Sequence, residues 1–131
     1  MNDIYLHQFK KIWQQTGWEY SGEVTPEAIA DHWKSFVQGC EGVYTGSVFD
    51  FDQGVLFRST IEKILTNAEM AIYPEFKAFV EAVYETDTDF RALTREGRVG
   101  EFWWERALLR NTGALYKEQI QLYYGISFPE E

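Results

Sequence analysis

The chain carries at residues 25–40 the stretch TPEAIADHWKSFVQGC, which contains both a start signal and a stop signal for an α-helix. Thr25 has a hydroxyl that can accept a hydrogen bond from one of the unpaired N–H groups at a helix start. Pro26 suits the first turn, because a proline lacks the N–H group that would go unpaired there. Glu27 places a negative charge at the positive end of the helix dipole. Gly39 is a typical stop signal, so we expect the helix to end there.

Apolar side chains three or four residues apart continue the helical pattern on both sides of this stretch. Within it, the stripe consists of Ile29, Trp33, Phe36, Val37 and Cys40. An earlier helix, capped by Asn2 or Asp3 and ended by Gly17, is predicted by Tyr5, Phe9, Ile12, Trp13 and Thr16. A later helix, capped by Asp52, is predicted by Phe57, Ile61, Ile64, Leu65, Ala68 and Ile72. Another helix is expected around Pro74, with the stripe Phe76, Phe79, Val80 and Val83.

Three segments depart from this regular spacing. Residues 43–51 combine β-branched and aromatic residues around Gly46, which predicts a short hairpin or an irregular loop. Residues 85–89, ETDTD, are typical of a helix break followed by a new cap. We expect a short helix after them that ends near Gly97.

The third segment, residues 101–124, carries a seven-residue apolar repeat that suits one long helix. Asn111-Thr112-Gly113 is a stop-and-restart signal within it, and a glycine inside a helix costs about 1 kcal/mol. We therefore expect two helices with a tight break, with a strand in the second half as the alternative. The tail, residues 128–131, is expected to fray.

Length and composition indicate a single domain over residues 1–131, since domains commonly contain about 100–150 residues. The chain is 45% hydrophobic and 18% aromatic, which is enough to fill a core without a metal or disulfides. The expected fold is mainly α. It is a single compact bundle of five to seven short helices around an aromatic core, with at most a small β hairpin near residues 43–51.

The chain has a formal net charge of −9, and the acidic residues are unevenly distributed. Residues 41–90 contain ten acids against three bases. An acidic protein is a poor general binder of nucleic acid, because that affinity comes largely from neutralising phosphates. The same charge attracts a basic protein and can accelerate its association. Solubility alone is the simpler use of such a charge.

The expected location is the cytoplasm. Cys40 is the only cysteine, so no disulfide can form within the chain. Residues 1–20 contain no apolar run of signal-peptide length, and no stretch approaches the roughly 20 apolar residues that span a bilayer.

Six acids are the candidate partner-binding residues: Asp50, Asp52, Glu81, Glu85, Asp87 and Asp89. They would form one negative face for a basic protein, unless arginines of the same chain pair with them instead. Acid–base catalysis by Glu81 and Glu85 would need a carboxylate in an apolar setting or a tightly paired partner. The sequence indicates neither, so a solvated acidic surface is the simpler interpretation.

Arginines alternate with aromatic residues between residues 91 and 110, a mixture that can stack bases and hold phosphates. Intervening glutamates dilute that charge, and the tryptophans are more naturally core residues. An oligomer interface is the other possibility, because Trp and Arg are enriched at interface hot spots. Its candidate residues are Arg98, Trp103, Arg106 and Arg110.

No metal or cofactor is expected. The stretch DFDQG at 50–54 resembles a calcium loop only superficially, because its glycine comes one position early and the closing glutamate is replaced by Ile61. His7 and His32 are the only histidines, and neither stands at zinc-ligand spacing from Cys40. We expect Cys40 to be a buried thiol rather than a nucleophile. The common phosphate-loop, dinucleotide, hydrolase and metalloprotease motifs are all absent from the sequence.

The sequence thus favours a non-catalytic acidic module that binds a basic protein, such as a toxin or nuclease. In general character the chain is similar to bacterial immunity or inhibitor proteins, which are small, acidic and cytosolic and neutralise cationic toxins. Size and charge carry this likeness of type, and no motif does. The alternatives are a small enzyme with a pocket near residues 42–54 and a homodimeric regulatory protein.

Overall fold

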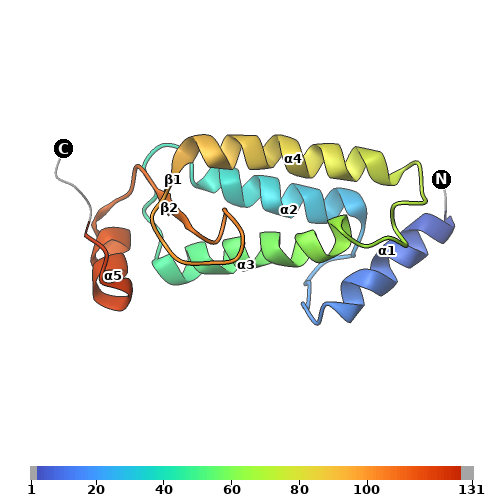
Figure 1. Ribbon diagram of the computed structural model, residues 1–131, viewed down its shortest axis with the longest axis horizontal. Coiled ribbons are helices and arrows are strands. Elements are labelled where there is room, and N and C mark those ends of the chain that lie inside the picture. The colour runs from blue at the N-terminus through green and yellow to red at the C-terminus, as the bar shows by residue number, and fades with distance from the viewer. Residues whose placement is uncertain (1–2, 128–131) are drawn as a thin grey trace.

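The computed structural model describes residues 3–127, which form five helices and one antiparallel hairpin (Figure 1). The helices are α1 (Asp3–Gln15), α2 (Pro26–Gly39), α3 (Val48–Leu65), α4 (Phe76–Leu93) and α5 (Ala114–Tyr124). The strands are β1 (Thr94–Glu96) and β2 (Ala107–Leu109). The predicted mainly α fold with five to seven helices is therefore confirmed. Asn2, the alternative cap, and the tail at 128–131 lie outside the described residues.

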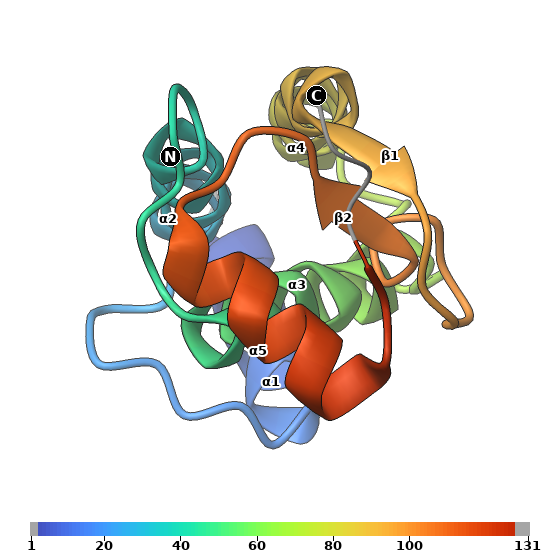
Figure 2. The same ribbon diagram turned by 90° about the vertical axis from the view of Figure 1, so that its left-hand side faces the viewer.

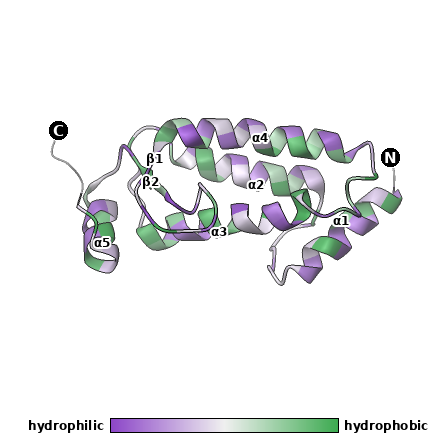
Figure 3. Cartoon of the chain, in the orientation of Figure 1, coloured by the Kyte–Doolittle hydropathy of each residue, from purple (hydrophilic) through white to green (hydrophobic). Residues whose placement is uncertain are grey.

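Three long helices, α2, α3 and α4, lie side by side, and α3 runs opposite to the other two (Figure 1). Viewed from one end, the three helices lie at the corners of a triangle, and α5 lies across the end where α3 begins (Figure 2). α1 packs against α3 near the opposite end. The hairpin follows α4 directly and lies beside its C-terminal end. Hydrophobic and hydrophilic residues alternate along the helices, as expected when each turns one face inward (Figure 3).

The core is largely aromatic, as predicted. Its largest fully buried apolar side chains include Phe9, Trp13, Trp33, Phe51, Phe57, Phe90 and Tyr116. Phe51 and Phe90 join α3 to α4 with their ring centroids 6.0 Å apart, and Phe51 also meets Tyr116 of α5 edge-on at 5.5 Å. Aromatic rings bury a large apolar area and favour offset or edge-to-face contacts. They therefore stabilise the bundle at several helix junctions.

The structure confirms the signals around α2 and the stop after α1, whereas Asp3, one of the two predicted caps, is the first residue of α1 itself. Thr25 Oγ1 accepts a hydrogen bond from the N–H of Ala28 at 3.1 Å, and Pro26 is the first residue of α2. α2 ends at Gly39, as predicted. After α1, Gly17 adopts a φ of 81°, a left-handed conformation that glycine enters without a steric penalty.

The start of α3 differs from the prediction in two ways. The helix begins at Val48, so residues 43–51 form no hairpin. Residues 43–47 form the irregular loop that was the alternative prediction, and within it only Tyr44 makes an isolated bridge, to Thr112. The cap is Ser47, whose Oγ accepts from the N–H of Asp50 at 3.0 Å. Asp52 as the cap is therefore wrong. Ser47 stands immediately before the buried residue Val48, and the next buried residue of the helix is Phe51.

The break predicted at residues 85–89 is also wrong, because α4 continues through it to Leu93. Asp87 points into the protein, and its carboxylate binds Arg58 instead of capping a helix. The hairpin then forms where helices were expected. Residues 107–109 are all buried and pair with 94–96, so only α5 remains of the two helices predicted over 101–124.

Gly54 provides a test of the packing between α2 and α3. A methyl group added there would lie 2.2 Å from the nearest ring carbon of Phe36, whose ring stacks on Trp33. Gly54→Ala is expected to lower the free energy of unfolding by about 1–3 kcal/mol through overpacking, despite the better helix propensity of alanine. The control is Gly39→Ala, where an added methyl group meets nothing within 4 Å. Equal stability of the two variants in urea denaturation would contradict this account.

Candidate functional site

The six candidate acids do not form one face. Glu81, Glu85 and Asp89 are exposed on α4, and Asp50 is exposed in the first turn of α3. Asp52 is engaged by Arg98, whose Nη1 donates to Asp52 Oδ1 at 2.8 Å, and by the hydroxyl of Tyr124 at 2.7 Å. Asp87 is buried. The proposed single patch therefore loses Asp52 and Asp87 to contacts within the chain.

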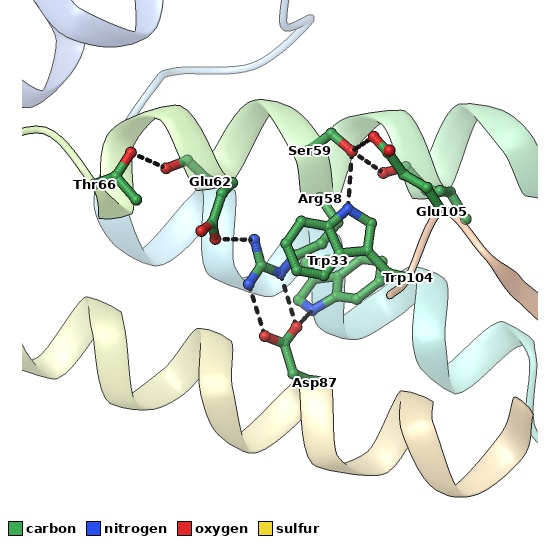
Figure 4. Close-up of polar contacts among 9 residues, drawn as sticks. Trp33, Arg58, Ser59, Glu62, Thr66, Asp87, Trp104 and Glu105 are labelled. Carbon is green, nitrogen blue, oxygen red and sulfur yellow. Dashed lines mark hydrogen bonds and ion pairs between the residues drawn. The ribbon is translucent and has the colours of Figure 1, made fainter. Parts of the chain in front are cut away.

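The buried Asp87 belongs to a polar network between α3 and α4 (Figure 4). Arg58 is only 1% exposed, and its Nε and Nη2 each donate to one oxygen of the Asp87 carboxylate at 2.8 Å. Trp33 of α2 adds a third hydrogen bond to Asp87, from Nε1 at 2.9 Å. The two charges are thus paired and hydrogen-bonded, which is the condition for burying them at tolerable cost.

The loop between the two strands covers this network. The Arg58 guanidinium lies 3.9 Å from the ring centroid of Trp104, and the Trp104 indole N–H donates to Ser59 Oγ at 2.8 Å (Figure 4). Ser59 in turn donates to Glu105 at 2.6 Å. The network therefore connects three helices and the loop, and its contacts are those of a structural element. The sequence indicated that an acid of the 81–89 segment could pair with an arginine, but it did not identify Arg58.

An open pocket of about 440 Å³ adjoins the network, lined by Arg58, Glu62, Tyr84, Asp87, Thr88, Arg91, Trp103 and Trp104. No histidine or cysteine lines it. A second small pocket, of about 230 Å³, lies by the start of α3. Its acid, Asp52, is already bound to Arg98 and Tyr124. Neither pocket is therefore lined by the serine–histidine or cysteine–histidine pair that many covalent mechanisms use.

Burial shifts the pKa of two further side chains, Cys40 and His32. Burial raises the pKa of the Cys40 thiol to about 12, so the thiol stays protonated at neutral pH. Burial lowers the pKa of His32, whose ring lies 4.2 Å from that of Phe57. Across residues 3–127, no group of three or more His, Cys, Asp or Glu side chains is placed to hold a metal ion.

A third pocket has a different character, and we call it the acidic groove. It measures about 530 Å³ and lies where α1, α2 and the start of α4 meet. Its lining consists of Tyr5, Leu6, Pro26, Glu27, Ala30, Asp31, Glu75, Ala78, Phe79 and Ala82. Three of these residues are acids, seven are apolar or aromatic, and none is a base.

The sequence explains the shape and the charge of the acidic groove. Ala30, Ala78 and Ala82 present only methyl groups, so the helices leave space between them. Burial raises the pKa of Tyr5 to about 12, and the negative charges of Glu27 and Glu75 contribute to the shift. The carboxylates of Glu27 and Glu75, at the starts of α2 and α4, therefore both affect the Tyr5 hydroxyl in the groove. Glu27 and Glu75 were not among the predicted site residues, because each alone is an ordinary acid at a helix start.

The exposed acids of α4 extend from this groove. Glu85 follows Ala82 by three residues and Ala78 by seven, so it lies further along the same face of the helix. Glu81 and Asp89 stand four residues to either side of Glu85. The ammonium group of Lys77 lies 3.9 Å from the Glu81 carboxylate, and both side chains are highly exposed. Such an exposed ion pair contributes little to stability. The row of exposed acids Glu81, Glu85 and Asp89, which we call the acidic ridge, therefore stays negative.

The candidate interface residues divide into two groups. Arg98 is paired with Asp52, and its guanidinium lies 4.3 Å from the ring centroid of Tyr124. Trp103, Arg106 and Arg110 line a separate pocket of about 500 Å³ beside the hairpin. Trp103 and Arg106 are half-buried, whereas Arg110 is exposed. Trp104, by contrast, is buried over Arg58.

Comparison of the chain with protein-family models, with curated proteins and with solved structures gives no significant match in any of the three. No helix within residues 3–127 is both long enough and apolar enough to cross a membrane.

Proposed function

We propose that the protein is a non-catalytic binding module that engages a basic protein partner at the acidic groove. The observation that carries this proposal is the combination of an apolar floor with a rim of carboxylates, from Glu27 and Asp31 of α2 and from Glu75 immediately before α4. A lysine or arginine side chain matches both features. Its methylene stem can lie on the alanines and Phe79, while its charged end reaches the rim.

The acidic ridge of Glu81, Glu85 and Asp89 would attract the basic partner before it reaches the groove. Charges at the edge of an interface mainly steer the approach of a partner and set its salt dependence. A basic protein would therefore be attracted along α4 and held at the groove. This arrangement fits an inhibitor or immunity-type protein that neutralises a cationic toxin or nuclease in the cytoplasm.

A neutralised groove tests the proposal. Glu27→Gln, Asp31→Asn and Glu75→Gln are combined in one variant, and the wild type is used to isolate a basic partner from the native host. Binding of the purified partner to each variant is then measured by titration calorimetry. We expect the groove variant to bind at least about tenfold more weakly, which corresponds to about 1.4 kcal/mol.

The matched control removes the same three charges elsewhere, at the exposed residues Glu19, Glu41 and Glu118. We expect its affinity to change by less than about twofold, because long-range attraction between exposed charges is screened by salt. A further variant, Ala82→Trp, fills the groove without changing its charge and should also weaken binding. Equal loss in the control variant would reduce the interaction to net charge and would overturn the assignment of the groove.

A further inference from the structure

The pocket beside the hairpin has the opposite charge to the acidic groove, and we call it the arginine–tryptophan groove. It measures about 500 Å³ and is lined by Arg91, Thr94, Arg95, Glu96, Trp103, Arg106, Ala107 and Arg110. Four bases against one acid give it a formal charge of +3 within a chain of net charge −9. It shares no lining residue with the acidic groove.

Contacts within the protein hold three of these arginines in place. The Arg91 guanidinium lies 4.1 Å from the ring centroid of Trp103. Arg110 donates from Nε to the carbonyl oxygen of Thr94 at 3.0 Å. Arg106 donates from Nε to Glu96 at 2.7 Å and from Nη1 to the carbonyl oxygens of Gly100 and Glu101. Side chains fixed in this way lose less conformational entropy when a ligand binds.

Two of the held arginines retain donors for a ligand. The hydrogen bond of Arg110 uses only Nε, which leaves both of its terminal nitrogens without a partner among residues 3–127. The Arg91 guanidinium carbon lies 4.1 Å from the Trp103 ring centroid, and the Arg91 side chain makes no hydrogen bond to another side chain or carbonyl among residues 3–127. A planar guanidinium offers paired donors that match the oxygens of a phosphate group.

Trp103 supplies the second feature of the groove. Its ring is half-buried, and it lines both the arginine–tryptophan groove and the neighbouring pocket of about 440 Å³. The buried ring of Phe90 packs against the Trp103 ring, with the ring centroids 5.9 Å apart. Because Arg91 covers one face of this ring, a flat ligand would meet the part of the indole that stays exposed, in the edge-to-face contact that aromatic rings favour.

We propose that the arginine–tryptophan groove binds a mononucleotide. The phosphate group is held by Arg91 and Arg110, and the base lies along Trp103. Arg95 and Arg106 add positive charge around the phosphate. This site is independent of the acidic groove, so either one can fail its test without affecting the other.

Titration calorimetry at low ionic strength tests the proposal with three probes: AMP, adenosine and inorganic phosphate. We expect AMP to bind with a Kd below about 1 mM, and each of the other probes to bind at least about tenfold more weakly. Failure of AMP to bind at about 10 mM would overturn the proposal. Equal affinity for AMP and phosphate would overturn the role assigned to Trp103.

The variant Arg91→Gln/Arg110→Gln should weaken AMP binding by at least about tenfold. Its control, Lys34→Gln/Lys63→Gln, removes two exposed charges from α2 and α3 and should change the Kd by less than about twofold. Circular dichroism of each variant checks the fold. If the double variant unfolds, Arg110→Gln alone provides the test, because Arg110 is exposed and its side chain makes a single hydrogen bond among residues 3–127. Unchanged AMP binding by either arginine variant would contradict the proposal.

Discussion

Replacing Asp87 by alanine is expected to lower the free energy of unfolding by about 3–5 kcal/mol, because the buried guanidinium of Arg58 loses its buried counter-ion. Asp87 accepts two hydrogen bonds from Arg58 and one from Trp33, so three donors lose their acceptor at once. Glu62 remains 3.0 Å from Arg58 but is partly exposed and meets only Nη1. Urea denaturation, followed by tryptophan fluorescence, measures the loss.

Asp89→Ala is the matched control, since it makes the same chemical change two residues further along α4 at an exposed position. We expect its effect to stay within about 0.5 kcal/mol. The double variant Arg58→Met/Asp87→Leu removes both charges and should be more stable than Asp87→Ala, because no uncompensated charge remains. If Asp87→Ala unfolds at the same urea concentration as Asp89→Ala, the pair does not stabilise the fold.

The stretch around Asp87 shows how far sequence reasoning reaches. Residues 85–89 have the composition of a helix cap, and a capping carboxylate and a buried one are the same residue type. The choice between them depends on Arg58, which lies 29 positions away in the sequence, and local patterns carry no information about that distance. α2 was predicted correctly because its signals, from Thr25 to Gly39, all act within the helix itself.

The hairpin illustrates the same limit for β structure. Residues 94–96 and 107–109 are short, and each acquires its strand conformation only from pairing with the other. The seven-residue apolar repeat in residues 101–124 correctly predicted α5. In residues 107–109, which form a strand, the apolar residues mark burial and not a helix. Burial on all sides is compatible with a strand as well as with a helix.

The sequence predicted that the candidate site is acidic, but it did not predict where the acidic groove lies. The sequence indicated acids on α4, and three of them are exposed as expected. The carboxylates of the acidic groove, by contrast, come from the starts of α2 and α4, which meet only in the folded protein. The alanines that form the groove give no signal of their own, because alanine has the highest helix propensity and suits any helix position.

Phe90→Ala is expected to lower the free energy of unfolding by about 3–5 kcal/mol through the cavity that it leaves. The Phe90 ring is fully buried and lies 5.2 Å from Trp33, 6.0 Å from Phe51 and 5.9 Å from Trp103, measured between ring centroids. These neighbours come from α2, α3 and the loop after β1, so no single element can move to fill the space.

The control for Phe90 is Tyr84→Ala, which removes a similar ring from the same helix at a position that is 53% exposed. Its cost should stay below about 1 kcal/mol, because little apolar area returns to water. Phe90→Ala should also loosen Trp103, since the ring beneath it is gone. A stability close to that of Tyr84→Ala in urea denaturation would show that the aromatic contacts of Phe90 do not hold the helices together, and Trp103 would then need another support.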